Sequence, residues 1–197
     1  MSVEIPKDEL GAMPPPHWFE GKIVYELGNK KNTSGLYRDW YVANKASYTC
    51  FDWNGSDRAI KLDFGQPLPD VHIGRADLVT NFGFTEHVFT DQKQAWRNLL
   101  AMAEKSGCYV ACVLPTPGHW EHHGVYQPSV KWLTEFFCCN GFTLVRNYIN
   151  TDRKRHVNVI CAVRDVLRPF HWPEEQIHIT SPTRRANPAE KNCGVTP

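Results

Sequence analysis

Ala76-Asp-Leu-Val-Thr-Asn-Phe82 has the pattern of a buried strand, and it opens the clearest structural unit of this 197-residue sequence. Residues 91–104 follow it with apolar side chains along one helical stripe, and Gly107 is suited to end that helix. A second strand is predicted over residues 108–114. A strand, a helix and a strand in this order are typical of a sheet with parallel strands.

The segments before this unit predict further strands and one helix. The expected elements are a strand at 23–27 ended by Gly28, a helix over 33–42, and strands at 47–52 and 58–62. Only ten residues separate Asp52 from Asp63, which is too few for a parallel crossover with its own helix. We therefore expect either that this helix is missing or that the third strand is not regularly paired.

The segments after it predict a helix over 129–139 and two strands, 142–149 and 157–163, that form an antiparallel hairpin. The fold class is therefore α/β, with a Rossmann-like, mostly parallel sheet, helices on both faces and a C-terminal antiparallel hairpin. We expect one domain over residues 21–166. Residues 1–20 are interpreted as an N-terminal arm laid over it, with Pro14 to Pro16 non-helical, and residues 167–197 as an irregular C-terminal tail.

Composition narrows the function classes. Lys and Arg number 22 against 21 Asp and Glu, so the strong phosphate attraction of a dedicated, sequence-independent nucleic-acid binder is not indicated. No apolar run reaches the roughly 18 residues of a membrane span, and the N-terminus lacks the pattern of a secretory signal. The seven cysteines form no CxxC pair. We expect a cytoplasmic protein with reduced thiols and no membrane partner, and a homo-oligomer is left open.

Acidic residues follow three successive strands. Glu26, Asp52 and Asp63 stand at or just after the predicted strand ends, and an Asn-Phe-Gly turn at 81–83 follows the fourth strand. Ligands on parallel sheets bind beyond the carboxyl ends of the strands, near the point where the strand order reverses. The sequence therefore predicts a ligand site at this edge.

With these residues the sequence resembles the class I S-adenosylmethionine-dependent methyltransferases, specifically short bacterial or phage-like members with a Glu-Leu-Gly-Asn first motif and few glycines. The resemblance covers roughly residues 21–165 and implies S-adenosylmethionine as cofactor. It places Glu26 and Gly28 beside the methionine part, Asp52 on the ribose hydroxyls and Asp63 near the adenine. The predicted cofactor contacts are Glu26, Gly28, Asn29, Asp52, Trp53, Asp63, Phe64, Asn81, Phe82 and Gly83.

Physical chemistry favours these roles independently. A carboxylate can accept hydrogen bonds from both ribose hydroxyls, and acidic or aromatic groups suit a cationic sulfonium. A nicotinamide dinucleotide would require Gly-x-Gly-x-x-Gly after the first strand, whereas Gly28 is followed next by Gly35. The glycine-poor loop also leaves a second function open, a catalytically inactive module of the same fold that binds or scaffolds.

A histidine-rich loop is the second candidate site. His119, Glu121, His122 and His123 lie within five positions, and Glu86-His87 is expected at the same edge of the sheet. His119 and His122 would face together only on a helix, which the nearby prolines and glycine disfavour, so no metal ligand is assigned. Metal-dependent hydrolysis by this loop remains a further alternative.

The methyl acceptor is not identified by the sequence. We expect direct displacement, with proximity supplying most of the rate gain. Where the acceptor must lose a proton, the candidate bases are His87, His122 and His123. The predicted substrate contacts are Glu86, Trp120 and Tyr126.

Overall fold

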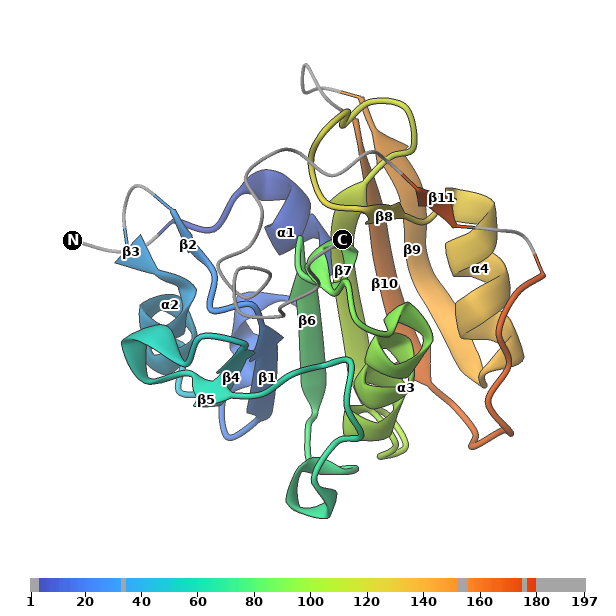
Figure 1. Cartoon of the computed structure of the whole chain (residues 1–197). Coiled ribbons are helices and arrows are strands. Elements are labelled where there is room, and N and C mark those ends of the chain that lie inside the picture. The colour runs from blue at the N-terminus through green and yellow to red at the C-terminus, as the bar shows by residue number, and fades with distance from the viewer. Residues whose placement is uncertain (1–3, 33–34, 152–155, 175–176, 180–197) are drawn as a thin grey trace, which may run out of the picture.

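The computed structural model describes residues 4–32, 35–151, 156–174 and 177–179. Its centre is a seven-stranded sheet with the order β5-β4-β1-β6-β7-β10-β9, in which β10 runs antiparallel to its neighbours and the other strands are parallel (Figure 1). The strands of this sheet are β1 (Ile23–Leu27), β4 (Ser47–Asp52), β5 (Ile60–Lys61), β6 (Leu78–Phe82), β7 (Tyr109–Pro115), β9 (Phe142–Asn150) and β10 (Val157–Arg164). The predicted fold class, including the terminal hairpin, is confirmed.

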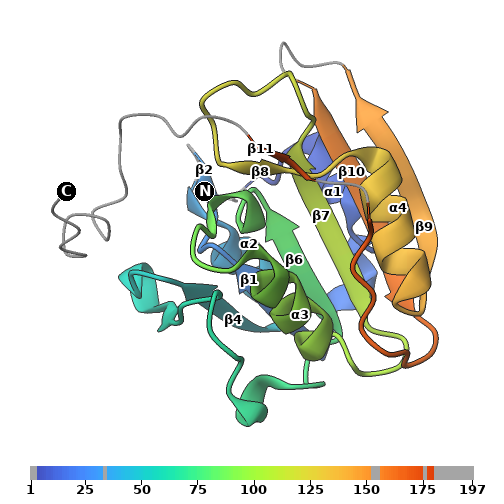
Figure 2. The same cartoon turned by 45° about the vertical axis from the view of Figure 1, so that its right-hand side comes forward.

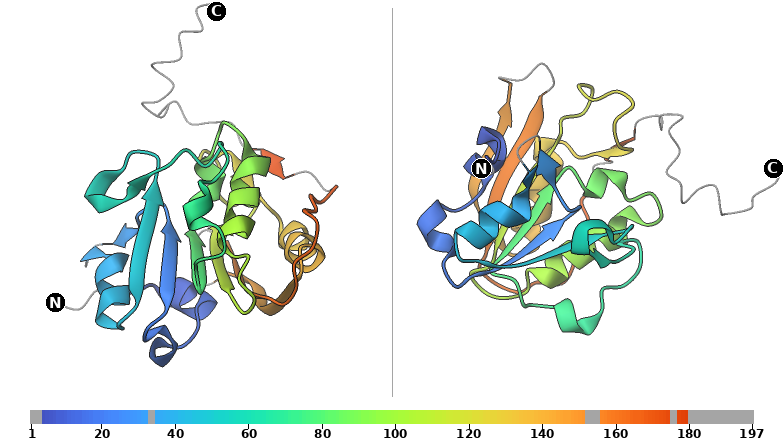
Figure 3. Two further views of the ribbon diagram at one scale, coloured as in Figure 1. Left: turned by 90° about the horizontal axis from the view of Figure 1, so that it is seen from below. Right: turned by 90° about the vertical axis from the view of Figure 1, so that its left-hand side faces the viewer.

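Helices cover both faces of the sheet (Figures 2 and 3). The α-helices are α1 (Lys7–Ala12), α2 (Tyr37–Ala43), α3 (Gln92–Met102) and α4 (Val130–Cys139). The 3-10 helices are η1 (Pro16–Phe19), η2 (Ser56–Arg58), η3 (Asp70–His72) and η4 (Thr85–His87). Two small two-stranded sheets complete the structure, β2 (Lys31–Asn32) with β3 (Gly35–Leu36) and β8 (Tyr126–Gln127) with β11 (His178–Ile179).

Local sequence explains where α3 and α4 begin. The side chain of Asp91 accepts a hydrogen bond from the backbone N–H of Gln94 at 2.9 Å, and that of Ser129 accepts one from Trp132 at 3.0 Å. These N-caps satisfy backbone donors that the helix itself leaves unpaired. The apolar stripes behind them bury Trp96 against Trp132, which fixes both helices on one face of the sheet.

The opposite face is covered by α2 and by the N-terminal segment. Ala12, Met13 and Phe19 are buried there with Tyr37 and Tyr41 of α2. Residues 4–20 thus supply part of the core on this face, and the proximity of α1 to β7 and β10 is visible in Figure 1. No helix in the described ranges is long and apolar enough to cross a membrane.

Two sequence expectations about local structure were wrong or incomplete. Pro16 was expected to be non-helical, yet it begins η1, a position that tolerates proline because the first turn needs no backbone N–H. The helix expected from residue 33 begins at Tyr37, because Gly35–Leu36 pairs with Lys31–Asn32. Residues 33–34, and residues 180–197 of the expected tail, lie outside the described ranges.

The short connection between the second and third parallel strands has the predicted form. The single turn η2 replaces a crossover helix, and β5 pairs with β4 over two positions, Phe51 with Ile60 and Asp52 with Lys61. The chain then returns to β6 on the other side of β1. The strand order therefore reverses between β1 and β6, which is where ligands bind on sheets of this kind.

Candidate active site at the carboxyl edge of the sheet

Glu26, at the end of β1, lies inside the protein. Its Oε1 accepts hydrogen bonds from the backbone N–H of Lys30 at 2.5 Å and from the Tyr48 hydroxyl at 3.0 Å, and Oε2 has no hydrogen-bond partner among the described residues. Burial raises the pKa of this carboxyl to about 8, although the two hydrogen bonds oppose the rise. Glu26 therefore fixes the conformation of the loop after β1 from inside the protein, and its side chain does not reach solvent.

Contacts with two other loops fix the loop after β1, which contains Gly28 and Asn29. Gly28 has a φ of 92°, and a Cβ added there would lie 2.8 Å from Cδ2 of Phe84. Asn29, with a φ of 38°, donates from its side chain to the carbonyl of Ser56 at 3.1 Å. The aromatic ring of Phe84 thus packs directly on the backbone of Gly28, and only glycine fits that approach.

Lys30 is a feature that sequence reasoning missed. Its Nζ donates to the carbonyl of Phe82 at 2.9 Å and lies 3.7 Å from Oε1 of Glu9. The side chain thus bridges the loop after β1 and the end of β6, which places a positive charge at the switch point. A basic residue two positions after the loop glycine was the available signal.

The acids after β4 and β5 are accessible. Asp52 is half-buried, and its Oδ1 accepts from the backbone N–H of Asn54 at 3.1 Å. Asp63 is exposed, and its Oδ1 accepts from the backbone N–H of Gly65 at 2.9 Å. Neither forms an ion pair with another described residue. The hydrogen bonds to the carboxylates of Asp52 and Asp63 from other described residues all go to Oδ1, and the Trp53 ring is exposed beside Asp52.

The other predicted cofactor contacts shape the site from within. Phe64 is buried with its ring 5.1 Å from that of Phe84. The buried side chain of Asn81 accepts from the backbone N–H groups of Phe84 and Thr85, so it forms the turn after β6. Phe82 points to the opposite face of the sheet, and Gly83 has a φ of 75°. These residues position the loop, and their side chains are not presented at its surface.

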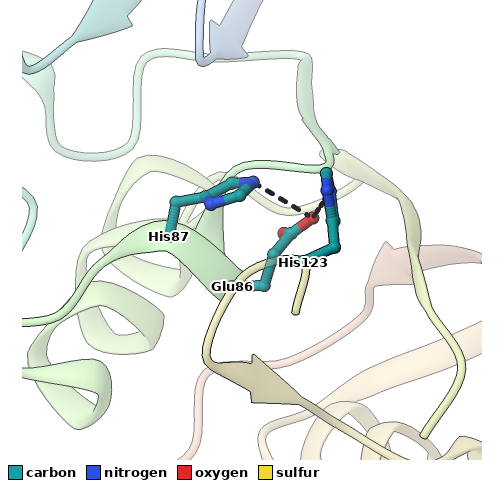
Figure 4. Close-up of side chains that lie close together, drawn as sticks. All are labelled: Glu86, His87 and His123. Carbon is teal, nitrogen blue, oxygen red and sulfur yellow. Dashed lines mark ion pairs between the residues drawn. The ribbon is translucent and has the colours of Figure 1, made fainter. Parts of the chain in front are cut away.

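A second cluster lies beyond the ends of β6 and β7. Glu86 is 1% exposed, and its Oε1 lies 3.9 Å from Nε2 of His87 and 4.0 Å from Nε2 of His123 (Figure 4). The two imidazole rings are 5.0 Å apart. Burial raises the pKa of Glu86 to about 7. Burial, and then the nearby His123 and Lys30, lower the pKa of His87 to about 4, so this imidazole is neutral at pH 7.

Two loops are tied together to make this cluster. The backbone N–H of Val125 donates to the carbonyl of Glu86 at 2.8 Å. A Cβ at Gly124 would lie 2.6 Å from Cγ of Glu86, so glycine permits the contact. The Gln127 amide donates to the carbonyls of Trp120 at 2.8 Å and His123 at 3.1 Å, which fixes the histidine loop.

The remaining predicted residues of that loop lie elsewhere. His122 is exposed with a φ of 60°, and His119 stacks on His156 with ring centroids 3.9 Å apart. Trp120 donates from its indole N–H to the carbonyl of His156, and its ring packs 5.0 Å from that of His123. Tyr126 is half-buried in β8. Of the three candidate bases, the structure brings together His87 and His123.

The sequence matches no protein-family model and none of the curated proteins. Solved structures do match. The 16S rRNA (adenine(1408)-N(1))-methyltransferase from Catenulisporales acidiphilia is 12% identical and superposes with a TM-score of 0.54, over 85% of this chain and 97% of that one. Magnesium protoporphyrin IX methyltransferase from Synechocystis PCC 6803, solved with S-adenosylmethionine, is 16% identical, with a TM-score of 0.52 over 75% and 72% of the two chains. The chain has the class I methyltransferase fold.

A solved protein with a different described activity also has a similar fold. A structure from Rhodobacter sphaeroides described as a putative zinc-dependent alcohol dehydrogenase is 13% identical, with a TM-score of 0.50 over 74% of this chain and 84% of that one. Because a fold does not by itself select a reaction, the function must be argued from the residues at the edge of the sheet.

Proposed function

We propose that the protein transfers a methyl group from S-adenosylmethionine to an acceptor by direct displacement. The observation that carries the proposal is the Asp52 carboxylate, which ends β4 beside the switch point with one oxygen unengaged by the described residues. A carboxylate there can accept the hydroxyls of a ribose. The solved structure of the Synechocystis methyltransferase with bound S-adenosylmethionine, which shares this fold, supports the choice of cofactor.

The residues at the edge suit this cofactor in charge and chemistry. Asp52 would hold the ribose, Asp63 would lie at the adenine end, and the exposed Trp53 ring offers an aromatic face. The Lys30 ammonium lies across the switch point, where it can pair with the carboxylate of the methionyl part. Glu26 acts indirectly, because it fixes the backbone N–H of Lys30.

When bound, S-adenosylmethionine supplies a methyl group already activated by its sulfonium, so the protein has to align and desolvate the reacting groups. The loops after β1 and β6 would hold the cofactor, and the loop that carries His123 would face the acceptor. His87 is a weak base at neutral pH because its pKa is low. His123 is therefore the better candidate for removing a proton from an acceptor that carries one.

Calorimetric titration of the full chain with S-adenosylhomocysteine tests the proposal. We expect saturable binding of one equivalent. 5′-Methylthioadenosine, which keeps the nucleoside and lacks the amino-acid part, should bind more weakly than S-adenosylhomocysteine. Absence of saturable binding by either compound would sink the proposal.

A second candidate function is a binding or scaffolding module without catalysis. The packing of Phe84 on Gly28 favours it, because this ring occupies space directly above the first loop. Substitution Phe84→Ala separates the two functions. If the protein is a non-catalytic module, S-adenosylhomocysteine should not bind to the wild-type chain and should bind only after the Phe84 ring is removed. If the protein is a methyltransferase, S-adenosylhomocysteine should bind to both proteins.

A further inference from the structure

Three side chains that can donate to a metal converge at the cluster beyond β6 and β7. One ligand atom from each of Glu86, His87 and His123 lies within 4.8 Å of the other two. Zinc ligands at about 2.0–2.1 Å in tetrahedral geometry place their donor atoms about 3.3 Å apart. The distances of 3.9 and 4.0 Å from Glu86 Oε1 to the two histidine nitrogens are close to that separation. Binding would require side-chain movements that shorten these two distances and the separation of the two histidine nitrogens, which is within 4.8 Å.

The burial of Glu86 is an independent observation that points to a ligand. Both carboxylate oxygens are inaccessible and have no hydrogen-bond partner in the described part of the chain. A buried carboxylate is normally paired, hydrogen-bonded or coordinated to a metal, because burial removes the hydration that stabilises its charge. The nearby ammonium of Lys30 is directed to the carbonyl of Phe82 instead.

We propose that Glu86, His87 and His123 bind a divalent transition-metal ion, with the chemistry of a zinc site. Two imidazoles and one carboxylate form a ligand set typical of open zinc sites, in which a fourth position is left for water or a ligand oxygen. The side chains of His87 and His123 are 41% and 42% exposed, so solvent reaches this side of the cluster, while the carboxylate forms its floor. The site does not rest on the proposed methyl transfer, and with a metal ion bound His123 serves as a ligand and is not available as a base.

The surroundings fix the backbone that carries two of the three donors, Glu86 and His123. The hydrogen bond from Val125 to the Glu86 carbonyl and the bond from Gln127 to the His123 carbonyl fix the backbone on both sides of the cluster. Gly83 and Gly124 leave room for the carboxylate, since a Cβ at Gly83 would lie 3.2 Å from Oε1 of Glu86. Fixed backbones of this kind limit how far the ligand side chains of Glu86 and His123 can move.

Titration of the chelator-stripped full chain with Zn²⁺, followed by calorimetry and by thermal unfolding, tests the proposal. We expect one tight equivalent and an increase in Tm. Glu86→Gln, which keeps shape and removes the charge, should weaken binding by at least about 10-fold, as should His87→Ala and His123→Ala. His122→Ala and His119→Ala are the matched controls from the same loop, and their affinity should stay within about 2-fold of wild type.

Several outcomes would overturn the site. These are no saturable binding, unchanged affinity in Glu86→Gln, or equal weakening in His122→Ala. Binding by one of the seven cysteines would appear as a thiolate charge-transfer band with Co²⁺, and its presence at the first equivalent also counts against the site. Far-ultraviolet circular dichroism checks that each variant folds. If a histidine variant does not fold, the isosteric Glu86→Gln variant still tests the site. The S-adenosylhomocysteine titration is a separate measurement, so either proposal can fail while the other stands.

Discussion

The carboxyl edge of the sheet carries two groups of ionisable side chains, one on each side of the switch point, and they are built differently. On the side of β4 and β5, Asp52 and Asp63 are accessible, and each accepts from a backbone N–H two residues further along the chain. On the side of β6 and β7, Glu86 is buried, its oxygens are unpartnered among the described residues, and His87 and His123 reach it from separate loops. Local turns orient the first two carboxylates, whereas tertiary packing brings the buried carboxyl of Glu86 together with two histidines from separate loops.

The largest effect is expected at Glu26, an acid at the end of β1 that is buried like Glu86. The pKa of Glu26 is about 8 in the folded protein against an ordinary value of 4.5, so the folded state keeps a proton that the unfolded state releases. Stability is therefore unaffected by this group below about pH 4.5, falls as pH rises towards 8, and then levels off. Glu26→Gln keeps the shape and removes that loss. At about 1.4 kcal/mol for each pKa unit, this shift has an upper bound of about 5 kcal/mol, and we expect the variant to gain about 3–5 kcal/mol over wild type by pH 8.5.

Urea unfolding of both proteins from pH 5 to pH 9 measures this difference. Glu20→Gln is the control, since Glu20 is exposed and pairs with the exposed Lys45 at 2.7 Å. A constant difference between Glu26→Gln and wild type across this range would contradict the expected titration.

The accessible acids are tested by ligand affinity. Asp52→Ala removes the proposed acceptor of two ribose hydroxyls, and charge-assisted hydrogen bonds of this kind are worth about 1.5–3 kcal/mol each. We expect S-adenosylhomocysteine to bind about 100-fold more weakly, measured by calorimetry. Asp70→Ala removes an exposed acid at the start of η3 and should leave the affinity unchanged. Equal affinity in wild type and Asp52→Ala would remove the nucleoside site from β4.

The packing of the buried group is tested by glycine substitution. Gly124 has a φ of 66°, and a Cβ there would collide with Cγ of Glu86 at 2.6 Å. Gly118 has a φ of 79° and no heavy atom within 4 Å of its Cβ position. Gly124→Ala should cost about 2 kcal/mol of folding stability and Gly118→Ala about 1 kcal/mol, since only the first adds a clash to the backbone strain. Thermal unfolding of the two variants measures these losses of stability. Equal losses would contradict the tight packing of Glu86 on Gly124.

The smallest expected effect concerns the residue that spans the switch point. Lys30→Gln removes the charge proposed to pair with the methionyl carboxylate, so S-adenosylhomocysteine should bind about 5-fold more weakly, in line with a partly exposed ion pair. 5′-Methylthioadenosine has no such carboxylate and should be unaffected. Lys31→Gln alters the exposed neighbour and serves as control. An equal loss for both compounds would place Lys30 at the nucleoside instead.

Much of the fold was predictable because its signals are local. The predicted strands 23–27 and 47–52 coincide with β1 and β4, and the helix predicted over 91–104 contains α3. In contrast, α1 was not predicted within residues 1–20 because its six residues are stabilised by packing on the sheet.

The candidate site was predictable in position more than in detail. The acids after β4 and β5 are accessible at the edge of the sheet, whereas Glu26 is buried under its own loop. Lys30 and Phe84 were missed. A basic residue close after the loop glycine was the only signal for Lys30, and no pattern in the sequence indicates which loop side chains meet across the switch point. Their contacts with Phe82 and Gly28 join loops far apart in the sequence.

The sequence by itself determined the order of strands and helices and the acids that follow the parallel strands, since apolar periodicity, helix caps and turn residues act over a few neighbouring positions. Only the tertiary structure decided that His123, and neither His119 nor His122, lies beside Glu86 and His87. The reason is physical: spacing along a chain predicts proximity within one element, whereas side chains on two loops meet where the sheet beneath them and the hydrogen bonds between them place their backbones.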